Sequence, residues 1–128
     1  MNLEQFLTWE IKVNPEIAHI GSILGEKISD DPAALINDLQ NIECWNSRCG
    51  YLLSEADSFL DRFSLTAMPP KEGRTEKDRE VQLESDCAPI RLVRDILERY
   101  CEAIKTRISL GQTILSFQKQ FNPEFKVK

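Results

Sequence analysis

The chain has 128 residues, of which 41% are hydrophobic and 29% charged, a composition typical of one folded domain and not of a disordered chain. No apolar run approaches the roughly 18 residues that a membrane span needs, and the first residues lack the basic segment and cleavage site of a secretory signal. We therefore expect a single cytoplasmic domain, residues 1–128, without membrane contact. Its net charge of −5 argues at first against a nucleic-acid ligand.

Residues 1–30 predict two short helices. Leu3, Phe6 and Leu7 follow the three-four spacing of an amphipathic helix. Asn14-Pro15 then combines a helix-capping residue with a proline suited to a first helical position, which favours a new helix that starts there and ends near residues 25–28.

Residues 32–63 predict one long helix. Ser29-Asp30-Asp31-Pro32 is a helix start signal, with acidic residues at the positive end of the helix dipole. Apolar side chains then recur every three or four residues up to Phe63, with no further proline. At about 1.5 Å per residue such a helix is nearly 50 Å long.

Residues 64–74 predict a loop, because Pro69-Pro70 and Gly73 interrupt the helical pattern. Thr75-Glu76-Lys77-Asp78 resembles a capping box in its Asp form and opens a second long helix, residues 75–121. Pro89 predicts either a kink or a restart within that helix. Asn122-Pro123 ends it and leaves a short basic tail, residues 122–128.

No segment alternates like a strand, so the predicted fold class is all-α: two long antiparallel helices, a helical hairpin, with two short N-terminal helices. Such a hairpin buries one seam and leaves apolar surface exposed. Since long stripes of three-four spacing suit coiled-coil packing, we expect assembly into a homo-oligomer. The alternative is a monomeric four-helix bundle.

The sequence shows no equipment for catalysis. Cys44 and Cys49 do not form a C-x-x-C motif, and the single His19 is not near any cysteine in the sequence, so we expect no metal and assign the thiols to core packing. Asp57 and Asp61 stand one helical turn apart, a spacing more typical of an exposed acidic ridge than of a metal site. No phosphate-binding glycine loop occurs. We predict no catalytic residue, no cofactor and no enzyme activity.

The charge is unevenly distributed along the chain. Residues 1–70 have a net charge of −7, residues 71–90 of −2 and residues 91–128 of +4. Basic side chains of the last helix can contact a phosphate backbone, and Tyr100 beside them can stack on a base. These nucleic-acid-binding candidates are Arg91, Arg94, Arg99, Lys105 and Arg107. The alternative is a solvated face on which Asp95 pairs with Arg91 and Arg99.

One stretch of the chain combines several sequence features. A helix with Tyr51, Glu55 and Ala56 precedes a polar loop opening at Arg74-Thr75-Glu76, followed by Arg79-Glu80-Val81. The last helix has the pattern Leu97-x-x-Tyr100-x-x-x-Ile104-x-x-Arg107-x-x-x-x-Gln112-x-x-Leu115. Residues 39–118 thereby resemble UvsY-like recombination mediators, small helical proteins encoded by phages. The resemblance implies an oligomer that binds single-stranded DNA and helps a recombinase displace a single-strand-binding protein. It assigns DNA contact to Lys105 and Arg107, supported by Arg91, Arg94 and Arg99.

We therefore predict a non-enzymatic accessory protein of DNA recombination, located in the bacterial host cytoplasm if phage-encoded. Its expected partners are further copies of itself, single-stranded DNA, and a recombinase or single-strand-binding protein. Two alternatives stay open. The acidic first half can dock on a basic partner, as in an anti-defence inhibitor that mimics DNA charge. The chain can also be a helical assembly protein that binds only through its helices.

Overall fold

Three helices make up the described part of the chain. The computed structural model describes residues 3–65 and 76–121, which form α1 (Leu3–Leu24), α2 (Pro32–Leu65) and α3 (Glu76–Phe121). These residues contain no strand, so the predicted all-α class is confirmed for them. Most of the predicted loop 64–74, the first residue of the predicted capping box and the basic tail 122–128 lie outside the described residues.

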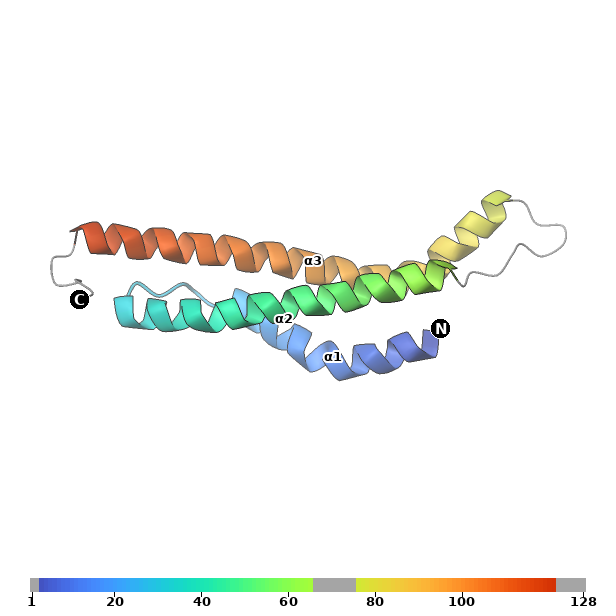
Figure 1. Ribbon diagram of the computed structural model, residues 1–128, viewed down its shortest axis with the longest axis horizontal. Helices are drawn as coiled ribbons and strands as arrows, with labels where there is room; N and C mark the ends of the chain where they lie inside the picture. The colour runs from blue at the N-terminus through green and yellow to red at the C-terminus, as the bar shows by residue number, and fades with distance from the viewer. Residues whose placement is uncertain (1–2, 66–75, 122–128) are drawn as a thin grey trace.

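The helices α2 and α3 lie side by side and run in opposite directions (Figure 1). Cys49 contacts Cys101 near the middle of the pair, and Asp57 contacts Arg94 further along α2. Since a higher residue number on α2 faces a lower one on α3, the pairing is antiparallel. Helix α1 lies along α2 and contacts both long helices, which gives an elongated molecule.

Local signals fix the start of α2. The Asp31 carboxylate accepts a hydrogen bond from the backbone N–H of Ala34 at 3.1 Å, as a helix-capping side chain does. The Ser29 hydroxyl oxygen accepts the Asp31 N–H, also at 3.1 Å, and holds the cap in place. Pro32 takes the first helical position, where its missing N–H costs nothing.

Helix α1 corrects the prediction of two short N-terminal helices. It is one helix of 22 residues that passes through Pro15 and bends midway (Figure 1). Pro15 deprives only the carbonyl of Ile11 of its helical partner, and both residues are exposed, so water can solvate that carbonyl. Buried side chains on both sides of the proline, among them Phe6 and Ile20, anchor both halves to the same core.

Pro89 kinks α3 and does not interrupt it. The helix is continuous over 46 residues, and its first part turns away from α2 (Figure 1). The proline removes the donor for the carbonyl of Ser85, and both residues are exposed. A bent but continuous helix therefore costs less free energy than a break and a new start. A new start would leave more backbone N–H and C=O groups without hydrogen-bond partners.

The core is a continuous apolar cluster between the three helices. Leu52 of α2 and Leu97 of α3 are fully buried at its centre. At one end of the core, Phe6 and Trp9 of α1 pack against the ring of Phe59 of α2, with ring centroids 5.8 and 5.3 Å apart. These contacts hold α1 onto the α2–α3 pair.

Candidate functional site

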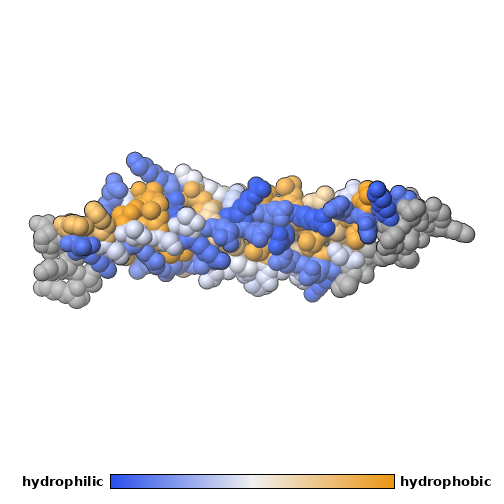
Figure 2. Space-filling view, turned by 90° about the horizontal axis from the view of Figure 1, so that it is seen from above, coloured by the Kyte–Doolittle hydropathy of each residue, from blue (hydrophilic) through white to orange (hydrophobic). Residues whose placement is uncertain are grey.

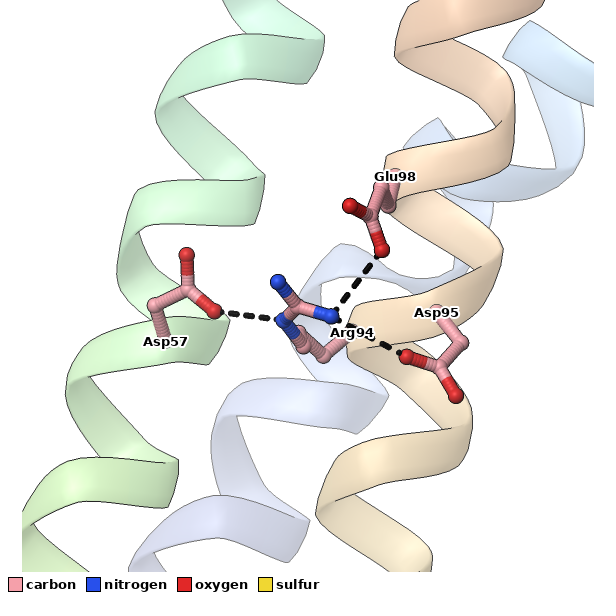
Figure 3. Close-up of polar contacts among 4 residues, drawn as sticks. All are labelled: Asp57, Arg94, Asp95 and Glu98. Atoms are coloured by element: carbon pink, nitrogen blue, oxygen red, sulfur yellow. Dashed lines mark hydrogen bonds and ion pairs between the residues drawn. The ribbon is translucent and has the colours of Figure 1, made fainter.

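The five basic side chains predicted to bind DNA lie on α3 but do not form one cationic patch. Arg94 is the clearest case (Figure 3). Its Nε donates to Asp57 Oδ1 of α2 at 2.7 Å, and its Nη1 donates to Glu98 Oε2 at 2.9 Å and to Asp95 Oδ1 at 3.3 Å. The hydrogen bond to Asp57 is the main reason why the pKa of Arg94 lies above its ordinary value.

This cluster is unsuited to a phosphate. One positive charge among three negative ones gives it a formal charge of −2, which repels a polyanion. The cluster also corrects the predicted pairs of Asp95 with Arg91 and Arg99, because Asp95 is bound to Arg94 instead. A carboxylate from α2 and one from the next turn of α3 bind the Arg94 guanidinium, and the neighbouring Asp95 carboxylate contacts the same group.

Two further candidates are also engaged. Arg91 Nη1 donates to Glu84 Oε1 at 3.2 Å, on an exposed part of α3. Arg107 Nη1 donates to the backbone carbonyl of Glu26 at 2.7 Å. Because Glu26 follows the C-terminal end of α1, this guanidinium lies at the negative end of that helix dipole, where a cation is favoured.

The remaining candidates are available for a ligand. Arg99 and Lys105 are exposed, and neither forms a hydrogen bond or ion pair with another described residue. Tyr100 is half-buried and packs against α1, where a Cβ added at Gly21 would meet its hydroxyl oxygen at 2.7 Å. The contact with α1 holds the Tyr100 ring in place, and its base-stacking role stays a prediction.

One ion pair that sequence reasoning missed ties α1 to α2. Arg48 binds the Glu16 carboxylate with two hydrogen bonds of 2.9 and 3.1 Å, and its guanidinium lies 5.3 Å from the ring centroid of Tyr51. The hydrogen bond to Glu16 is the main cause that raises the pKa of Arg48. The pair has a structural role, because it joins helices and leaves no free cation.

The cysteines occupy two kinds of position. Cys49, Cys87 and Cys101 are buried, as predicted for core packing, whereas Cys44 is exposed and corrects that prediction. The sulfur atoms of Cys49 and Cys101 lie 3.2 Å apart, and the Cys49 thiol donates to the Leu97 carbonyl at 3.6 Å. Burial in this apolar seam raises the pKa of Cys49 to about 12.

We expect thiol reagents to react with the exposed cysteine much faster than with the three buried ones. At pH 8, Cys44 should react with 5,5′-dithiobis(2-nitrobenzoate) within minutes, while the three buried thiols react only as the protein unfolds. Counting the thiols that react before and after adding guanidinium checks this. The assignment of Cys49 to the core is contradicted if a Cys44→Ser variant reacts as fast as the native chain.

The Cys49 pKa also predicts a pH dependence of stability. The unfolded state releases the thiol proton near pH 9, whereas the folded state keeps it up to about pH 12. The stabilisation by the neutral thiol is therefore complete below pH 9 and is lost as the pH rises through this window. Urea unfolding of the native chain should show a steeper fall between pH 9 and 12 than Cys49→Ala, and equal slopes would contradict the assignment.

The potential metal ligands are dispersed among the described residues. No group of three or more potential metal ligands occurs among them. Asp57, one of the two aspartates one helical turn apart, is bound to Arg94. His19 is exposed, and its ring lies 4.9 Å from that of Trp45. In the described part of the chain, no helix is long and apolar enough to cross a membrane.

Sequence reasoning also missed a second apolar face on α3. Large hydrophobic side chains are exposed along the side of α3 that points away from the core, and Figure 2 shows apolar surface at intervals over this side of the molecule. We call this set the outer stripe; it comprises Val81, Leu92, Leu110, Phe117 and Phe121. Leu92, Phe117 and Phe121 each keep more than 60% of their surface exposed.

The spacing of the outer stripe places its members on one side of α3. Its members follow one another at intervals of 11, 18, 7 and 4 residues, close to whole numbers of helical turns. A helix with two apolar faces is typical of one that packs against two neighbours. A smaller exposed set, Leu3, Leu7 and Ile11, follows every fourth residue on α1.

Comparison with known proteins adds no assignment. No protein-family model, curated protein or solved structure matches this chain. The likeness to UvsY-like recombination mediators therefore stays a prediction from the sequence.

Proposed function

We propose that the protein is a non-enzymatic helical assembly protein that acts by self-association. The observation that supports this most strongly is the outer stripe, a run of large apolar side chains over almost the whole length of α3. Exposed apolar side chains that line up along one helix face favour a protein interface, because water leaves that surface when a second helix covers it.

Packing inside the molecule adds support. The inner face of α3 already packs on α2 and α1, so the outer stripe cannot be covered by these helices. Burying one valine, leucine or phenylalanine side chain stabilises a complex by about 1.5–3 kcal/mol. Five such side chains along one helix are enough to hold two chains together against the entropy lost on association.

Co-purification tests the proposal. A tagged and an untagged copy of the chain, produced in the same cell, are expected to leave an affinity column together in high salt. Salt matters because it removes contacts that depend only on charge. Recovery of the tagged copy alone, from cells that contain equal amounts of both, would contradict self-association.

Single-stranded DNA binding is the second candidate function. It is favoured by one observation, the two exposed cations Arg99 and Lys105 that no described residue neutralises. An assembly repeats such cations and so gains avidity for a long polyanion. The accompanying role, loading a recombinase onto the strand, comes from the UvsY-like resemblance and is proposed together with DNA binding.

A labelled oligo-dT separates this candidate from an assembly without DNA binding. Fluorescence anisotropy should show binding that weakens steeply with salt. Lys105→Glu, an exposed position off the outer stripe, should weaken it several-fold, since the reversal changes the contact by two charges. The charge-matched control is Lys12→Glu, an exposed lysine outside α3. No binding at low salt, or equal losses in both variants, would contradict the assignment.

A further inference from the structure

The outer stripe reads nearly the same in both directions along α3. If a second α3 runs antiparallel with residue 101 as the common midpoint, Leu92 of one copy stands opposite Leu110 of the other. Val81 then stands opposite Phe121, and small exposed Ala88 opposite Ile114. Four of the five members of the outer stripe therefore face another large apolar member, with one residue of each pair on either side of the centre.

The charge along α3 reverses its sign between the two ends of the helix. Residues 76–90 contain five acidic and two basic side chains, a net of −3. Residues 91–104 are neutral, and residues 105–121 contain three basic side chains and no acidic one, a net of +3. Antiparallel pairing brings each acidic segment beside a basic one, whereas parallel pairing sets like charges together.

The residues at the centre of α3 also favour antiparallel over parallel pairing. Arg99 is exposed between Leu92 and Leu110, on the side of the outer stripe. Parallel pairing would place two Arg99 guanidinium groups against each other. Antiparallel pairing places Arg99 opposite the small Ala103 of the second copy and one residue from its Glu102, which supplies the opposite charge.

From the apolar spacing and the charge pattern together, we infer that the outer stripe of α3 is the contact with the antiparallel α3 of a second copy of this chain. The inference rests on the proposed self-association and names its surface, direction and register. It assigns Arg99 to the contact between copies, so within the pair Lys105 is the cation that stays open to an anion. The two acidic N-terminal segments of α3 lie at opposite ends of the pair.

Engineered cysteines test the direction and the register. The background is Cys44→Ser, since Cys44 is the exposed native thiol. On this background Leu92→Cys and Leu110→Cys are made singly and together, then oxidised with copper phenanthroline and run on a non-reducing gel. Within one chain the two positions are about 27 Å apart at 1.5 Å per residue, so they cannot bridge each other. The double variant should form a covalent dimer in most chains, and each single variant should form none above background.

A matched control rules out random collision. Arg91→Cys with Ser109→Cys has the same 18-residue separation on exposed positions, rotated about 100° around α3 from Leu92 and Leu110. It should stay monomeric on the gel. Circular dichroism of every variant checks that the helices persist.

Each other outcome is decisive. Cross-linking of the single variants shows parallel pairing and overturns the inference, while self-association stands. A dimer by light scattering with no cross-link in any variant moves the contact to another face and also overturns the inference. No cross-link together with a monomer mass overturns both the inference and the proposed function.

Discussion

Replacing both Leu92 and Leu110 with aspartate is expected to raise the dissociation constant of the self-associated protein at least about 100-fold. Each leucine is exposed in the single chain, so the change leaves the core untouched. In a symmetric pair every substitution counts twice. Losing the burial of each leucine costs about 1.5–3 kcal/mol, and an unpaired carboxylate in the contact costs more.

The control for this variant places carboxylates on the same helix outside the contact. Gln112→Asp with Ser109→Asp adds the same charge to exposed positions of α3 and should shift the dissociation constant by less than about tenfold. Sedimentation velocity over a dilution series measures both. Equal shifts would show that net charge, and not the outer stripe, governs association.

Leu97→Ala is expected to lower the free energy of unfolding by about 2–5 kcal/mol. Leu97 is fully buried between α2 and α3, and its carbonyl accepts the Cys49 thiol. Truncation leaves a cavity at the centre of the longest seam, and neighbouring side chains held on long rigid helices relax into it only in part. Urea unfolding followed by circular dichroism measures the loss.

Ile11→Ala is the control, because Ile11 is 74% exposed on α1 and loses few contacts when truncated. Its expected effect is below about 0.5 kcal/mol. Both proteins are compared at one protein concentration, since association adds to apparent stability. A loss for Leu97→Ala no greater than for Ile11→Ala would contradict the packing of α2 against α3.

The start of α2 was predictable because its signal is local and no packing contact opposes it. The start of α2 depends on Asp31 and Pro32, which lie next to each other in the sequence. The break expected at Asn14-Pro15 rests on a signal just as local, but there packing decides the outcome. Phe6 and Ile20 bury their side chains in one core on either side of Pro15, and that burial outweighs one lost backbone hydrogen bond.

The candidate site was less predictable, because the partners of its cations come from other helices. Arg94 is bound by Asp57, which lies 37 residues away, and Arg107 by the Glu26 carbonyl, 81 residues away. Spacing within one helix cannot reveal such partners. The Tyr100 hydroxyl likewise lies against another helix, because α1 approaches it closely at Gly21.

The outer stripe could have been found in the sequence. Leu92, Leu110, Phe117 and Phe121 stand outside the three-four pattern that gives α3 its core face. They repeat with a helical period of their own, and scanning each helix for a second apolar face would have detected them. What the sequence alone could not supply is which of the two faces packs against α2.

Sedimentation equilibrium of the native chain tests self-association through α3 most directly. We predict a mass twice that of the 14.7 kDa chain at micromolar concentration, which falls toward the single-chain mass on dilution. The Leu92→Asp, Leu110→Asp variant should keep the single-chain mass at the same concentrations. A native chain that sediments at 14.7 kDa at every concentration up to the millimolar range would contradict the account.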